Sequence, residues 1–361
     1  MKKYGTLLLL IFSVMYQAQI VRKYSNEFLN IGAGARGLGM GGAVLTSQDD
    51  VYSPMWNPAG LMGIDQDWQA AAMHAEYFES IAKYDYIGFA KPIDSRGGVF
   101  GVSIVRLGVD DILNTTQMID PEGNIDYDRI TKFSQADYAA LISYAFRPGG
   151  NHRLSVGATA KLVYRNVGKF ANAFGFGFDV GAIYNADNGW NYGFMARDIT
   201  TTVNFWNVDQ QELSTIVNGE EFNPAPEDKM ELTMPKLNAG ISKNFELSQS
   251  ISILPEAGLN IDFAKTAALV STEFASLTPY AGAEMNYSDL IFVRLGVNRF
   301  QTITDIENLN RKVSFQPSAG IGIHYRGLTL DYAITNSGLG GSNYFSNYFS
   351  LKFDMGAFRS N

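Results

Sequence analysis

Apolar and polar residues alternate with a period of two in many segments of about ten residues, which is typical of membrane-spanning strands. In 174–184, one face carries three Phe followed by Val, Ala and Tyr, whereas the opposite face carries mainly Gly and one Asp. We expect the apolar face to meet lipid and the small polar face to line a lumen. Fourteen such segments are predicted, at 67–77, 81–91, 98–106, 135–146, 152–167, 172–185, 190–198, 236–244, 250–262, 278–286, 290–300, 313–325, 328–335 and 345–355.

The connections between these segments differ in length with a regular parity. Those after even-numbered segments are short, whereas most of those after odd-numbered segments are long, at 107–134, 199–235, 263–277, 301–312 and 336–344. Bacterial outer-membrane barrels have an even strand number, short periplasmic turns and long external loops. The sequence therefore predicts an all-β fold, a 14-stranded antiparallel transmembrane β-barrel spanning 67–358, with both termini in the periplasm.

The N-terminus carries an export signal. Lys2 and Lys3 precede an uncharged run from 4 to 20 that is too short to cross a bilayer comfortably. We interpret residues 1–18 as a signal peptide cleaved after Ala18, which indicates export. Together with the predicted barrel, this indicates an outer-membrane location. The alternative is a buried N-terminal strand or helix.

Composition excludes several classes of protein. The chain of 361 residues has no Cys, which excludes a disulfide scaffold and a Cys-built metal site. Its net charge of -8 argues against a nucleic-acid partner, because phosphate binding depends on Lys and Arg. Charged residues on the lumenal face, such as Asp179 and Arg294, form either a mutually compensating interior or an ion or substrate pathway.

A Gly-rich segment at 19–66 does not alternate, and we predict that it forms a plug inside the barrel. A Gly-rich loop that binds nucleotide phosphates would need a βαβ unit around it, and none is predicted here. Glycines allow close approach of one backbone to another. The hatch motif of this segment comprises Gly37, Gly39, Met40, Gly41, Gly42, Asp49, Asp50, Asn57, Pro58, Ala59 and Gly60.

At this spacing, the hatch motif resembles that of the PorV/PorQ family, within the wider group of barrels similar to the fatty-acid transporter FadL. The resemblance implies an outer-membrane protein of a Bacteroidetes-type Gram-negative bacterium that works in type IX secretion. Its expected partners are membrane lipid, a large translocon barrel and cargo proteins with C-terminal sorting domains. It would receive emerging cargo and carry it toward the cell surface.

Catalysis is not expected. The chain has only three histidines, His74, His152 and His324, and no His-Glu spacing typical of a metal site. Ser318 and His324 lie on one strand face but about 20 Å apart, at roughly 3.3 Å per residue. We predict no enzyme activity, no cofactor and no metal.

The longest predicted loop, 199–235, offers a candidate contact with cargo or another partner through Phe205, Trp206 and Val208. The alternative is a solvated loop that shields the barrel mouth. Two functions from different classes therefore remain open. One is the secretion component, which could also be a paralogue that serves only some cargo. The other is a transporter of hydrophobic small molecules, for which we expect an apolar pocket in the lumen and an opening in the wall.

Overall fold

A computed structural model describes residues 25–64, 67–93, 97–224, 226, 229–304, 311–336 and 344–356. The predicted signal peptide, the first residues of the predicted plug, and the acidic residues Glu227 and Asp228 lie outside the described residues. Within the described part of the chain, no helix has both the length and the apolar character needed to cross a membrane.

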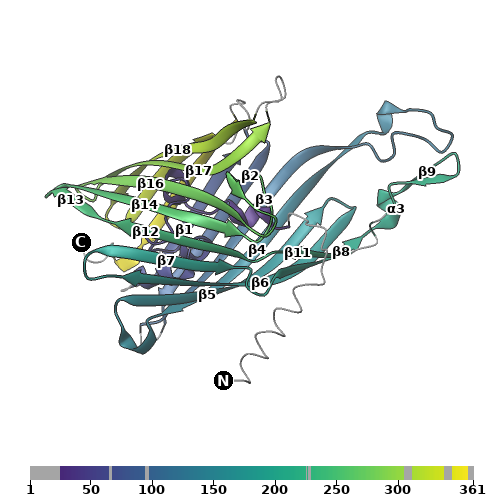
Figure 1. Ribbon diagram of the computed structural model, residues 1–361. Helices are drawn as coiled ribbons and strands as arrows, with labels where there is room; N and C mark the ends of the chain where they lie inside the picture. Colours follow the sequence, from purple (N-terminus) through teal and green to yellow (C-terminus); the bar gives the residue numbers. More distant parts are fainter. Residues whose placement is uncertain are drawn as a thin grey trace.

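The described chain forms a closed antiparallel β-barrel of fourteen long strands, which confirms the predicted fold (Figure 1). We call these strands staves. The last stave, β20, pairs with the first, β1, so that neither stave is left as a free edge. The staves are β1 (Gln69–Tyr77), β2 (Ala82–Pro92), β3 (Val99–Asn114), β4 (Thr131–Phe146), β5 (Leu154–Val167), β6 (Ala171–Asn185), β7 (Trp190–Arg197), β12 (Lys236–Lys243), β14 (Ile251–Asp262), β16 (Ser276–Tyr287), β17 (Ile291–Thr304), β18 (Arg311–Tyr325), β19 (Leu328–Asn336) and β20 (Phe345–Asp354).

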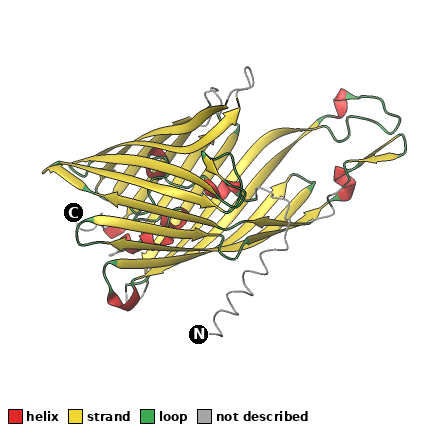
Figure 2. Cartoon of the chain, in the orientation of Figure 1, coloured by secondary structure: helices red, strands yellow, loops and turns green. Residues whose placement is uncertain are grey.

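Short elements complete the fold, and the helical ones lie mainly inside the barrel or in its loops (Figure 2). The hairpin formed by β9 and β10 is the one sheet separate from the barrel among the described residues. The short strands are β8 (Thr202–Val208), β9 (Thr215–Val217), β10 (Glu220–Phe222), β11 (Met230–Thr233), β13 (Phe245–Ser248) and β15 (Val270–Ser271). The helices are η1 (Glu27–Asn30), α2 (Ala35–Gly39), η2 (Ser53–Met55), η3 (Pro58–Gly63), η4 (Tyr127–Arg129), η5 (Pro148–Gly150) and α3 (Gln210–Leu213).

Two neighbouring staves are interrupted at the same place in the wall. The strand β6 pairs with β7 over 180–185 and with β8 over 171–176, so β8 continues the stave that β7 begins. In the same way, β11 pairs with β8 while β12 pairs with β7. Asp198 and Thr201 adopt positive φ angles of 52° and 61° in the first interruption, which is uncommon for residues other than Gly. The predicted loop 199–235 is therefore shorter than expected, because both of its ends are barrel strand.

Two connections extend together away from the barrel mouth (Figure 1). One is the connection between β3 and β4, and the other contains α3 and the β9–β10 hairpin. They touch where the Asn218 amide donates to the Pro121 carbonyl at 2.8 Å and the Thr215 hydroxyl donates to the Thr116 carbonyl. We call residues 110–132 and 209–222 the arm. It carries ten acidic and two basic side chains, a net charge of -8 that equals the net charge of the whole sequence.

Candidate functional site: the plug and the cavity beside it

Residues 25–64 occupy the lumen, and the barrel wall holds their backbone at close range. On one side, the inward residues Gly282, Gly296 and Gly320 of β16–β18 lie against the hatch backbone from Gly39 to Gly41. A Cβ atom on Gly296 would overlap the Met40 carbonyl group, and one on Gly41 would lie 2.7 Å from the Val297 amide nitrogen. Only glycine permits this backbone-to-backbone contact, which explains why the Gly-rich run faces a Gly-lined wall.

On the opposite side, the hatch residues Asn57 and Pro58 fit against glycines of β5 and β6. A Cβ on Gly181 would overlap the Asn57 side chain, and one on Gly157 would lie 2.5 Å from the Pro58 carbonyl carbon. The Asn57 amide donates to the Leu45 and Ala182 carbonyls, each at 3.1 Å. The Asn57 side chain thus joins two parts of the fold, the plug and the wall.

The other hatch residues act within the plug. Trp56 is its central ring, and a Cβ on Gly37 would lie 2.8 Å from that ring. The Trp56 indole donates to the Ala33 carbonyl at 2.7 Å. Asn57 also caps η3 by accepting from the Ala59 amide at 3.2 Å, while Pro58 takes the first position, where no amide donor is needed. A Cβ on Gly60 would overlap the Gln48 carbonyl oxygen, so this turn also requires glycine.

Ion pairs tie the plug to the last staves of the barrel. The Arg36 guanidinium makes two hydrogen bonds, each of 2.9 Å, to the Glu284 carboxylate, which also binds Arg294 at 2.5 Å. Arg294 continues the chain to Asp331 at 2.5 Å. These lumenal charges compensate one another, which matches the first of the two alternatives given for them. Sequence reasoning did not pair Arg36 with Glu284, because they are 248 positions apart.

The hatch residue Asp50 is buried, and three donors surround it. Lys352 lies 2.8 Å from one carboxylate oxygen, while the Gln48 amide and the Tyr52 backbone amide donate to the other at 2.7 and 2.9 Å. Burial alone would raise the pKa of Asp50, but the Lys352 charge and these hydrogen bonds outweigh it and lower the pKa below its ordinary value. Asp49, by contrast, remains exposed.

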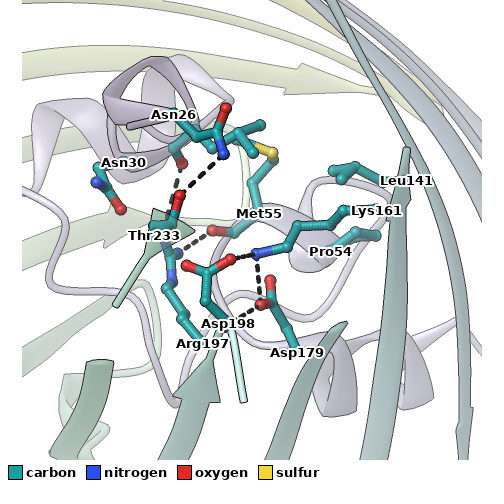
Figure 3. Close-up of a pocket in the computed structure, with 11 residues that line it drawn as sticks. Asn26, Asn30, Pro54, Met55, Leu141, Lys161, Asp179, Arg197, Asp198 and Thr233 are labelled. Carbon is teal, nitrogen blue, oxygen red and sulfur yellow. Dashed lines mark hydrogen bonds and ion pairs between the residues drawn. The ribbon is translucent and has the colours of Figure 1, made fainter. Parts of the chain in front are cut away.

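A second charge cluster lies where the wall is interrupted (Figure 3). The buried Lys161 ammonium binds Asp179 at 2.6 Å and also binds Asp198. Beside them, Arg197 turns toward the plug and donates to the Met55 carbonyl. The small space between these residues has a volume of only about 10 Å³, so the wall and the plug are closely packed here.

A much larger cavity, of about 1670 Å³, lies between the plug and the long-loop end of the barrel. The plug supplies its apolar floor, whereas Asn238, Asn260 and Asn298 add polar groups from three staves. Lys236, at its rim, pairs with Asp262 at 3.4 Å. The cavity also reaches Thr201, Met234 and Pro235, which lie at the two stave interruptions. The apolar residues of its floor are Phe28, Ile31, Leu38, Leu45 and Trp56.

The three residues predicted to contact a partner do not share one surface. Phe205 belongs to the outer face of the barrel, where it pairs with Phe174 of β6 and is 54% exposed. Trp206 is partly buried, with its indole donating to Glu231 at 3.0 Å and the Arg165 guanidinium 5.2 Å from its ring centre. Val208 is partly buried at the end of β8. Strand β8 separates them because its side chains alternate between the two faces of the wall.

Comparison with known proteins shows the fold alone. No protein-family model matches the chain, and no curated protein matches it. Among solved structures, the toluene transporter TodX of P. putida is 13% identical with a TM-score of 0.54, covering 90% of this chain and 99% of that one. The toluene transporter TbuX of Ralstonia pickettii is 12% identical with a TM-score of 0.53, covering 89% and 98%. A FadL homologue of Pseudomonas aeruginosa is 12% identical with a TM-score of 0.50, covering 89% and 97%.

The chain thus has the same barrel fold as these transporters, a FadL-like architecture. The names of these neighbours describe channels and transporters rather than enzymes. The narrower resemblance to the PorV/PorQ family finds no match, so that branch, type IX secretion and a Bacteroidetes-type source stay predictions.

Proposed function

We propose that this protein binds hydrophobic small molecules in the outer membrane and passes them across it. The observation that carries the proposal is the cavity of about 1670 Å³, because ligand sites are concave and mainly apolar with a few polar groups. Its neighbours in fold include transporters named for toluene and channels named for monoaromatic hydrocarbons. This supports the transport function over the secretion function.

The wall interruption marks the place of a sideways route, which is closely packed in this structure and would have to open for a ligand to pass. Thr201, Met234 and Pro235 line the cavity and also lie between the two halves of the interrupted staves. An apolar ligand that left the cavity here would enter the membrane instead of the periplasmic water. The plug supports the same direction, since it packs closely against glycines on two sides of the wall below the cavity.

Trp56 provides a direct test, since its ring lines the cavity floor. We expect the fluorescence of the purified protein in detergent to fall in a saturable way when a brominated long-chain hydrocarbon is added. Trp56→Phe should remove that saturable component, whereas Trp190→Phe, at a short-turn end of the wall, should keep it. Equal, linear quenching of all three proteins would contradict the proposal, because it would indicate partition into the detergent.

A second candidate is the secretion component, which we keep because the arm favours a protein partner. The arm has a net charge of -8, the same as that of the whole sequence, and it extends away from the barrel (Figure 1). The proposed partners remain a large translocon barrel and cargo proteins with C-terminal sorting domains. Replacing 209–222 with a short Gly-Ser linker should reduce the amount of type IX cargo at the cell surface. Normal cargo levels with an equally abundant variant barrel would argue against this function.

A further inference from the structure

Outward-facing charges are concentrated on the first three staves. His74 and Glu76 lie on β1, Lys83 and Asp85 on β2, and Arg106 on β3, all on the outer side of the wall. Their neighbours in sequence point inward, and Met73 and Tyr84, for example, are buried in the lumen core. On β12, β14, β16 and β18, by contrast, the outward positions are uncharged apart from Lys243 and Arg311 at strand ends.

These charges shorten the apolar band of the wall. On β2, only Ile87 and Phe89 face outward between Asp85 and Lys91. Six residues cover about 20 Å along a strand, or about 15 Å of height at a tilt near 40°. On β6, the outward positions from Phe174 to Tyr184 are uncharged over about 33 Å of strand, or about 25 Å of height, which is the usual height of the apolar band.

The charged side chains are paired with one another but remain accessible. Asp85 binds His74 at 2.7 Å and Arg106 at 3.3 Å. The three side chains keep exposed fractions of 51% for His74, 37% for Asp85 and 32% for Arg106. Hydrocarbon tails offer no hydrogen bonds, so charged groups at membrane depth face protein or water instead of lipid.

A trough runs directly below these charges on the outer face of β1. Its floor consists of two small residues, because Ala72 lies between Leu351 and Ile87 in the sheet, and Ala70 lies between Phe353 and Phe89. The flanking Ile87 and Leu351 side chains are exposed by 66% and 43%. The Trp68 ring closes the lower end, packing 5.9 Å from Phe89 and 5.5 Å from Phe353 between ring centres.

We propose that another integral outer-membrane protein covers this wall, which consists of the trough at Ala70 and Ala72 and the cluster of His74, Asp85 and Arg106. The partner presents a ridge of bulky apolar side chains to the trough and hydrogen-bonding side chains to the cluster. A second copy of this chain does not fit, because a two-fold contact would place one trough against another and leave both unfilled. This surface is independent of the cavity and of the proposed transport.

Photo-crosslinking from single positions in native membranes tests the proposal. A photoreactive residue at Ala72 should give one discrete adduct, whereas the same residue at Ala281, an outward, exposed alanine of β16, should not. The adduct partner should be an integral outer-membrane protein, identified by mass spectrometry. An adduct of two copies of this chain, an adduct with a soluble protein, or lipid adducts alone at both positions would each overturn the proposal.

A combined variant separates partner binding from folding. His74→Leu, Asp85→Leu and Arg106→Leu together make the wall apolar, so a barrel surrounded by lipid would keep or gain stability. We expect this variant to remain folded by heat-modifiable gel migration while the Ala72 adduct falls by about tenfold or more, since the hydrogen-bonding side chains of the partner would be left without partners of their own. A folded variant with an unchanged adduct would show that the charged cluster does not take part in recognition, and would overturn the proposal.

Discussion

The two halves of the lumen are lined by the same staves but differ in the size of the side chains that point inward. In the plugged half, inward positions are glycines such as Gly240, Gly258 and Gly296. The plug backbone lies directly against Gly296, the Leu45 side chain of the plug lies against Gly240, and the Tyr280 ring of the wall covers Gly258. Two residues further along the same strands, the inward residues are Asn238, Asn260 and Asn298, and these line the cavity. Along these three staves, side-chain size therefore differs between the part of the lumen that the plug fills and the part that stays open as the cavity.

The difference also predicts how each half responds to change. A half in which backbone touches backbone has no rotamers that can move aside, so added atoms or lost charges are costly. A half that encloses a cavity can accept larger side chains with little loss of stability.

The largest effect should come from Arg36→Met in the plugged half. The change leaves Glu284 with one of its two arginines, and removing a partner from a buried ion pair costs about 3–5 kcal/mol. Urea unfolding of the barrel in lipid vesicles measures the loss. The control is Arg153→Met, which breaks an exposed pair with Asp187 and should cost at most about 1 kcal/mol. Equal effects of the two changes would mean that Arg36 does not anchor the plug.

Gly296→Ala should be next, at about 1–3 kcal/mol or more, because the new Cβ overlaps the Met40 carbonyl group. The plug should shift, and protease cleavage within 25–64 should become faster. The matched variant Leu295→Ala changes the neighbouring residue that faces outward, and it should leave cleavage unchanged. If protease cleaves the plug at the same rate in both variants, the close backbone contact is not what holds the plug in place.

The Asp50–Lys352 pair should respond to pH. Because the folded pKa of Asp50 is lowered, its contribution to stability is fully present above the ordinary pKa of about 3.9 and is lost as pH falls through the folded value. We expect Asp50→Asn to destabilise the protein at pH 7 and to have less effect below pH ~3. Unfolding midpoints of both proteins across this range measure the difference, and a gap that does not narrow at low pH would contradict the pairing.

The smallest effect on stability, within about 0.5 kcal/mol, should come from Thr278→Phe, which adds a large ring to the cavity half. The ring takes up cavity volume, so the quenching of Trp56 by brominated hydrocarbon should need a higher ligand concentration. A loss of stability as large as that of Gly296→Ala would remove the distinction between the two halves.

The stave pattern could be predicted because it depends on local alternation. The expected segment 250–262, for example, differs by one residue at its start from β14. The interruption at Asp198 could not, because a positive φ at a non-glycine residue is held there by contacts with Lys161 and Asp179 from other strands. The cavity was not located either, since it has no motif and its walls come from most of the staves.

The plug also constrains the order in which the molecule is assembled. It is synthesised first, yet many of its anchors belong to the staves made last: the Ala35 amide donates to Ser350 at 3.0 Å, and Asp50 pairs with Lys352. Ser350 and Lys352 both lie on β20, the strand that closes the ring by pairing with β1. The strand that closes the ring therefore also carries side chains that hold the plug. A plug supplied later as a separate peptide would arrive at a ring already shut.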